Sequence, residues 1–140
     1  MIPLITDRTE ADVLLGNAKG RYRYTDLNRV ETAVTELCGL ARQLGHGCDL
    51  CTKTDWGIPG TFPEESWMTE TQAARYLQNV RTLCDRFAVK IALPETLSGL
   101  DHNGANAIEQ ALAQVSGHIQ AIGQTFSYSG DFYAGEEYSL

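Results

Sequence analysis

The stretch that decides the fold runs from Thr25 to Leu44 and reads TDLNRVETAVTELCGLARQL. Its apolar residues recur at alternating spacings of three and four, so they form one heptad-like stripe along a helix. The members of the stripe are Leu27, Val30, Val34, Leu37, Ala41 and Leu44. Thr25 is a favourable N-cap, and Gly45 and Gly47 follow the last apolar residue. The pattern therefore predicts a helix of roughly 19 residues, about 29 Å long.

A second stripe of the same kind begins after Thr69. Gln72 follows Thr69 at the spacing of a capping box, which favours a helix start at this point. The apolar members of this stripe are Ala73, Leu77, Val80, Cys84 and Phe87. Pro94 prevents a helix from continuing past it, because the residue before a proline avoids the helical region.

A third helix is predicted to begin between Asp101 and Asn103 and to end at Phe126. Its stripe consists of Ile108, Leu112, Val115, Ile119, Ile122 and Phe126. Glycines within it cost up to about 1 kcal/mol each relative to alanine, and we interpret them as places where another helix approaches closely. These glycines are Gly104, Gly117 and Gly123. Three long helices of this kind predict a mainly α fold, either a bundle closed within one chain or a coiled-coil oligomer shared between chains.

We expect one domain over residues 1–140. Residues 1–8 form an N-terminal arm, and residues 9–126 form the helical region, which opens with a short helix capped by Thr9 and Asp12. The loop at 45–68 lies within this region, and we expect it to be ordered because it carries large aromatic residues. Residues 127–140 are predicted to form an extended C-terminal arm or a single hairpin, because glycines interrupt them.

Aromatic side chains in the loop and in the C-terminal arm are the candidate assembly interface. An apolar segment beyond the last helix normally marks a contact with a partner, although folding back on the chain's own core remains open. The predicted interface residues are Trp56, Phe62, Trp67, Tyr128, Phe132 and Tyr133.

A faint internal repeat links the first and third long helices. The segments NRVETAV at 28–34 and NAIEQAL at 106–112 both follow the pattern Asn-x-(Val/Ile)-Glu-x-Ala-(Val/Leu). Both lie in the first turns of their helices, with the apolar members on one face and Asn and Glu beside its edge. If the match is not chance, the two helices have similar packing roles.

The charge of the chain argues against nucleic acid and against anionic membranes as partners. The formal net charge is -7 at pH 7, and the basic residues are scattered apart from Lys19, Arg21 and Arg23. No apolar run approaches the length of a membrane span, and the first residues lack the pattern of a secretion signal. We therefore expect a chain that is made in a cytoplasm and stays there or leaves by lysis.

The sharpest local motif is Cys48-Asp49-Leu50-Cys51, preceded by His46. These residues resemble half of a zinc site, but no second Cys-x-x-Cys or His pair follows. The residues elsewhere that could complete four ligands are Cys38, Cys84, His102 and His118. A redox role does not fit either, because thioredoxin-type motifs lie in βαβ units. We therefore predict no bound metal and no cofactor.

No catalytic motif is recognisable in the chain. It has no Gly-x-Ser-x-Gly elbow, no phosphate-binding loop and no zincin helix. The acidic pairs at 64–65 and 136–137 are adjacent in sequence and are interpreted as solvated charge rather than as a general acid and base. We therefore predict no catalytic residues and no enzymatic activity.

A series of short motifs occurs in a fixed order over nearly the whole chain. They are YTDLNRVE at 24–31, TKTDW at 52–56, IP at 58–59, YLQNVR at 76–81, NAIE at 106–109, YSGD at 128–131 and AGE at 134–136. This series resembles a family of small proteins, or protein modules, encoded in the tail regions of phages and prophages of gut Firmicutes. The resemblance implies a virion structural component without enzymatic activity. It also implies that cysteines at positions 48 and 51 are not required in the family.

The sequence thus leads to an expected function of assembly. We expect a non-enzymatic phage virion structural protein, a tail-tip, baseplate or fibre-associated subunit that is made in the bacterial host cytoplasm. Its partners would be other virion proteins and copies of itself. One alternative is a small phage-encoded protein that sequesters a host factor or ligand. Another is a metal-binding regulator that uses His46, Cys48 and Cys51.

Overall fold

The computed structural model describes residues 4–16, 24–45, 49–56 and 69–133, with side chains described as far as Gly123 in the last range. The described residues contain the helices α1 (Glu10–Leu15), α2 (Tyr24–Gln43), α3 (Glu70–Arg86) and α4 (His102–Tyr133), and they contain no strand. The prediction of a mainly α fold is confirmed. Residues 57–68, with Phe62 and Trp67, lie outside the described residues.

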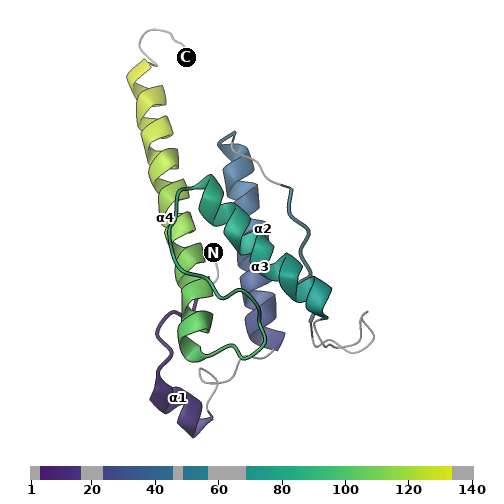
Figure 1. The fold of residues 1–140 in the computed structure, drawn as a ribbon. Coiled ribbons are helices and arrows are strands. Elements are labelled where there is room, and N and C mark those ends of the chain that lie inside the picture. The colour runs from purple at the N-terminus through teal and green to yellow at the C-terminus, as the bar shows by residue number, and fades with distance from the viewer. Residues whose placement is uncertain (1–3, 17–23, 46–48, 57–68, 134–140) are drawn as a thin grey trace.

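The three longer helices form a bundle in which each contacts the other two. Figure 1 shows that α2, α3 and α4 all run in the same direction, from the bottom of the view to the top. The chain must therefore return twice along the length of the bundle, between α2 and α3 and between α3 and α4. As a result, long connecting segments lie alongside the helices instead of forming tight turns between them.

The core is made where the apolar stripes of the three helices meet. Val34, Val80 and Val115, which lie midway along the stripes, have exposed fractions of 1%, 0% and 0%. The core also includes Val30, Leu37, Leu77, Leu83, Ile108, Leu112 and Ile119. Within the described chain the bundle is therefore closed by helices of one molecule, as one of the two predicted arrangements requires.

The helix starts agree with the predicted caps in part. α1 begins with a complete capping box, in which Thr9 and Asp12 bond to each other's backbone N–H groups. Thr69 caps α3 by accepting from the N–H of Gln72, but the Oε1 of Gln72 is buried without a hydrogen-bond partner among the described residues. α2 begins at Tyr24, so Thr25 lies within its first turn and is not its N-cap.

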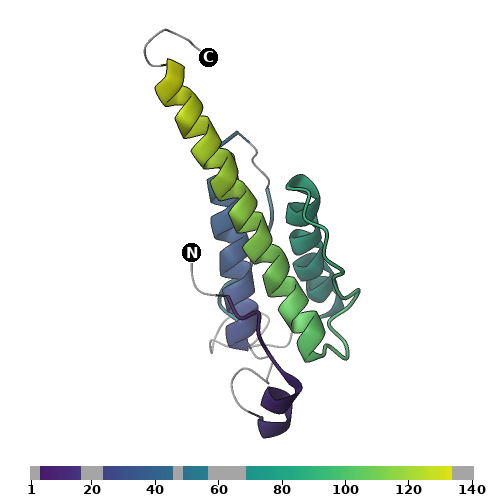
Figure 2. The ribbon, with the colours of Figure 1, turned by 90° about the vertical axis from the view of Figure 1, so that its left-hand side faces the viewer.

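α4 is longer than the sequence predicted. It continues through Tyr133, so the extended arm expected from Ser127 onward is wrong for residues 127–133. No proline interrupts this stretch, and an interior glycine costs a helix only about 1 kcal/mol, which does not terminate it. Figures 1 and 2 both show α4 projecting past the ends of α2 and α3. Residues 134–140 lie outside the described residues.

The glycines of α4 differ in what surrounds them. A Cβ at Gly104 would lie 2.9 Å from Cδ1 of Leu100, so this position does allow a close approach of the preceding loop. Among the described atoms, Cβ atoms at Gly117 and Gly123 would meet nothing within 4 Å. The prediction that these glycines accommodate a neighbouring helix is therefore wrong within the described chain, because Gly104 faces a loop and the other two face no neighbour.

Candidate functional site

The seven-residue repeat gives rise to two copies of one polar arrangement, which we call clasps. In the α4 clasp, Asn106 and Glu109 hold residues 5–8. In the α2 clasp, Asn28 and Glu31 hold residues 53–56. Each clasp fastens an extended segment to a helix, and the two segments lie far from their helices in the sequence.

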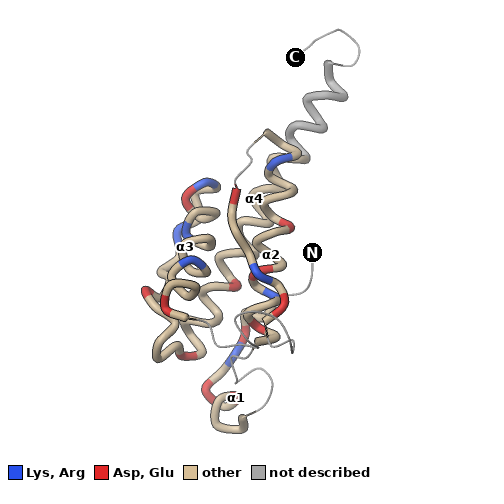
Figure 3. Tube along the Cα trace, turned by 90° about the vertical axis from the view of Figure 1, so that its right-hand side faces the viewer, with Lys and Arg blue, Asp and Glu red and all other residues tan. Residues whose placement is uncertain are grey.

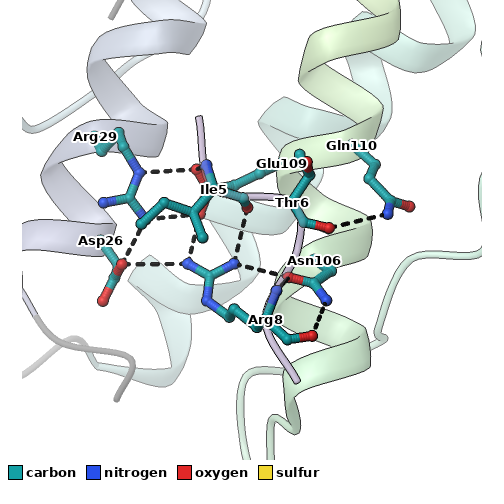
Figure 4. A network of polar contacts seen from close by, with 8 residues as sticks. All are labelled: Ile5, Thr6, Arg8, Asp26, Arg29, Asn106, Glu109 and Gln110. Carbon is teal, nitrogen blue, oxygen red and sulfur yellow. Dashed lines mark hydrogen bonds and ion pairs between the residues drawn. The ribbon is translucent and has the colours of Figure 1, made fainter. Parts of the chain in front are cut away.

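In the α4 clasp, the side chain of Asn106 forms hydrogen bonds with both backbone groups of Arg8. Its Oδ1 accepts from the N–H of Arg8 at 3.0 Å, and its Nδ2 donates to the carbonyl of Arg8 at 2.9 Å. Three residues further along α4, the Oε1 of Glu109 accepts from the N–H of Ile5 at 2.9 Å. Residues 5–8 therefore run antiparallel to α4, and the two contacts are three residues apart on the segment and on the helix, as Figure 4 shows.

The α2 clasp repeats these contacts. The N–H of Trp56 donates to Oδ1 of Asn28 at 2.7 Å, and Nδ2 of Asn28 donates to the carbonyl of Trp56 at 2.8 Å. The Oε1 of Glu31 accepts from the N–H of Lys53 at 2.9 Å. Asn and Glu thus satisfy backbone groups that have no partner in a helix or sheet, which buried backbone requires.

Each glutamate also accepts a bidentate pair of bonds from an arginine on another helix. Arg29 of α2 donates to Glu109 from Nε at 2.8 Å and from Nη2 at 2.7 Å. Arg75 of α3 donates to Glu31 from Nη1 at 2.7 Å and from Nη2 at 3.1 Å. Such paired bonds are geometrically specific as well as strong, so they fix the angle between neighbouring helices.

Each glutamate accepts a fourth hydrogen bond from a side chain of the extended segment that it holds. Nη2 of Arg8 donates to Oε2 of Glu109 at 2.7 Å, and Nε1 of Trp56 donates to Oε2 of Glu31 at 2.6 Å. Both glutamates therefore accept four hydrogen bonds although their residues are at most 1% exposed. Buried carboxylates are tolerated when they are paired in this way.

The α4 clasp also balances its charges. The carboxylate of Asp26, on a residue 2% exposed, pairs with both Arg8 and Arg29, so two guanidinium groups face two carboxylates. The pKa of Arg29 is raised further above its ordinary value, chiefly by its hydrogen bond to Glu109. The contacts with Glu109 and Asp26 therefore favour the charged form of Arg29.

These contacts suit fastening and not proton transfer. A general acid or base needs a lone pair or proton that is free to meet a substrate, within hydrogen-bond reach of it. In Glu31 and Glu109 both oxygens already accept two bonds each, and the side chains are enclosed. The clasps therefore hold the N-terminal segment and the loop to the bundle.

The predicted interface residues that the structure describes lie in two separate places. Trp56 is 0% exposed and belongs to the α2 clasp, so it contributes no exposed surface to this chain. Tyr128, Phe132 and Tyr133 lie on α4, but their side chains are outside the described part of the chain.

An apolar surface that the sequence analysis missed lies on α1. Val13, Leu14 and Leu15 are 44%, 82% and 76% exposed, and α1 buries none of its residues. The signal was present in the sequence, because three consecutive apolar residues on a helix of six cannot all face one side. Large exposed apolar patches are a common feature of contact surfaces in other proteins.

The candidate zinc ligands are not brought together among the described residues. Cys51 is exposed at a hollow of about 240 Å³, whereas Cys38 and Cys84 are buried, and burial raises the pKa of Cys84. Within the described ranges, no three His, Cys, Asp or Glu side chains are grouped to hold a metal ion. His46 and Cys48 lie outside these ranges, so the absence of a metal stays a prediction.

Three comparisons with known proteins found no match. No protein-family model matches the sequence, and no curated protein or solved structure matches it either. Among the described helices, none is both long enough and apolar enough to cross a membrane.

Proposed function

We propose that this protein is a non-enzymatic structural subunit of a phage virion, placed at the tail tip, the baseplate or the base of a fibre. One observation carries the proposal. The short motifs that resemble phage tail proteins contain the residues of the two clasps, among them Asn28, Glu31, Trp56, Asn106 and Glu109.

The chemistry of the clasp residues supports a structural role. In an enzyme, the distinctive polar residues surround a site that substrate can enter. Here the motif residues bind backbone groups and arginines inside the fold, and the two glutamates are enclosed. A subunit that must keep its shape within an assembly benefits from such fastening, because it fixes segments that helix packing alone leaves loose.

Two features supply contact surfaces for partners. α1 presents Leu14 and Leu15 to solvent, and α4 projects past the bundle. No other described residue covers Leu14 and Leu15, and their exposure costs free energy in water that contact with other virion proteins or copies of the chain would recover.

The test is quantitative mass spectrometry on purified particles. Particles from a host that produces the phage encoding this chain are separated on a density gradient and washed in high salt. Peptides from residues 76–123 are then compared with those of the major capsid protein, and an abundant host cytoplasmic protein serves as the control. We expect the chain to follow the capsid protein while the control is lost. A chain that stays in the soluble lysate would overturn the proposal and favour the sequestering protein.

A further inference from the structure

A hollow of about 240 Å³ lies between the C-terminal half of α2 and the segment that leads into the α2 clasp. The helix contributes Thr35, Cys38 and Arg42 to its lining, and the segment contributes residues 49–52. The three helix residues are three and four positions apart, so they lie on one face of α2. Two thiols, those of Cys38 and Cys51, therefore line the same hollow from two different elements.

The segment that forms one wall of this hollow runs antiparallel to α2. Trp56 bonds to Asn28 near the start of the helix, and Asp49 pairs with Arg42 near its end. Figures 1 and 3 show residues 49–56 alongside the bundle, on the side of α2 and α3. Going from Trp56 back to Asp49 therefore follows α2 from its start to its end.

A hydrogen bond between two threonines sets the register of the thiols. The Oγ1 atoms of Thr35 and Thr52 are 2.8 Å apart, so the Cα atoms of these residues are at most about 7.6 Å apart. From Thr52, one extended residue leads about 3.3 Å along the helix to Cys51. From Thr35, three helical residues lead about 4.5 Å to Cys38. The two cysteines are thus nearly level, on chains spaced about as closely as a disulfide requires.

The backbone of Cys51 is held in place from α3. Its carbonyl accepts from Nη1 of Arg75 at 2.7 Å and from Nδ2 of Asn79 at 2.8 Å. The same Nη1 of Arg75 donates to Glu31, so the position of Cys51 is tied to the α2 clasp. A backbone fixed in this way keeps its thiol beside the hollow, which raises the effective concentration of one thiol near the other.

The two thiols differ in their access to solvent. Cys51 is exposed, whereas Cys38 is only 6% exposed. A reagent in solution therefore reaches the sulfur of Cys51 first. The sulfur of Cys38 is then placed to react with Cys51 across the hollow, without having to meet the reagent itself.

We propose that Cys38 and Cys51 form a thiol–disulfide exchange site whose co-reactant is a small disulfide. The thiolate of Cys51 attacks one sulfur of the small disulfide, which forms a mixed disulfide and releases one thiolate. The thiolate of Cys38 then attacks the sulfur of Cys51, which forms the bond between the two cysteines and releases the second thiolate. The protein thiols lose two electrons and two protons, and the small disulfide gains them and becomes two thiols.

The bond fastens the end of the segment that the α2 clasp does not hold. The clasp binds residues 53–56, and beyond them Arg42 and Asp49 are exposed, so their ion pair contributes little. Joining Cys38 to Cys51 closes residues 38–51 into a loop, which restricts the unfolded chain and so stabilises the folded one. This effect does not depend on where the chain acts, so the inference stands apart from the proposed function.

The first test treats the reduced full chain with oxidised glutathione, a small disulfide, and maps the unreduced peptides by mass spectrometry. Cys48→Ser removes the competing thiol three residues from Cys51. We expect the bond between Cys38 and Cys51 to be the main one in the unchanged chain and in Cys48→Ser. The matched control, Cys48→Ser with Cys38→Ala, is expected to stop at a mixed disulfide of glutathione on Cys51.

The second test uses Cys48→Ser alone and distinguishes a preformed site from cysteines that meet by chance. The ratio of bonded to open chain is measured at fixed glutathione concentrations, in buffer and in urea that unfolds the chain. We expect this ratio to be about 100-fold higher in buffer. The thermal midpoint of the bonded chain is expected to be roughly 5–10 °C higher than that of the open chain. A main bond between Cys48 and Cys51 in the unchanged chain, a mixed disulfide that Cys38 does not resolve, or equal ratios in buffer and urea would each overturn the proposal.

Discussion

Glu109 offers the sharpest perturbation of the clasps. Glu109→Gln removes a carboxylate that is 0% exposed and accepts four bonds, from Ile5, Arg8 and twice from Arg29. Two guanidinium groups then face Asp26, and the new amide N–H₂ points at donors instead of accepting from them. Breaking a buried ion pair by removing one partner costs about 3–5 kcal/mol of the free energy of unfolding.

The loss is large enough to measure by thermal and urea denaturation followed by circular dichroism. At about 3 °C per kcal/mol for a chain of this size, the midpoint is expected to fall by roughly 10–15 °C. Glu31→Gln is expected to cost a similar amount, because Glu31 also accepts four bonds. Glu95→Gln, at an exposed position, is the charge-matched control and is expected to stay within about 0.5 kcal/mol.

A loss of less than about 1 kcal/mol of the free energy of unfolding for Glu109→Gln would contradict the clasp, since removing one partner of a buried ion pair leaves the other charge unpaired. If the variant does not fold at all, Asn106→Ala is the milder test. It leaves two backbone groups of Arg8 without their partner, which is expected to cost about 1–3 kcal/mol. An unchanged midpoint for Asn106→Ala would likewise contradict the clasp.

Three further predictions follow from burial and from the cysteines. Val115→Asp places a charge in the core and is expected to cost several kcal/mol, so a soluble variant with an unchanged melting temperature would show that the core is misassigned. Cys51 is expected to be alkylated fast in the native state, whereas Cys84 is expected to react only on unfolding, because it is buried and its pKa is raised. Equal rates by peptide mapping would contradict this difference. Purified protein is expected to hold well under one equivalent of zinc, and one zinc per chain that is lost in Cys48→Ser would refute this.

The helices could be predicted from the sequence because their evidence is local. The spacing of Val30, Val34 and Leu37 reports a helix face, and Thr9 and Thr69 report helix starts within a few residues. The end of α4 lies further along the chain than its glycines predict. The helix continues through them at a modest cost, and no proline stops it.

The clasps could not be predicted from such patterns. Ile5 and Glu109 are 104 positions apart, and no periodicity connects an extended segment with a distant helix. A glutamate at the edge of an apolar stripe is ordinarily solvated, so Glu31 and Glu109 gave no sign of burial. The repeat of Asn and Glu three residues apart was the available signal, but this pattern alone does not distinguish shared packing from shared binding of backbone.

The copy number of the chain in purified particles tests the central claim most directly. A structural subunit occupies a defined place, so its ratio to the major capsid protein is expected to be constant across gradient fractions and unchanged by high-salt washing. A ratio that varies between fractions or falls with each wash would contradict a structural role in the virion.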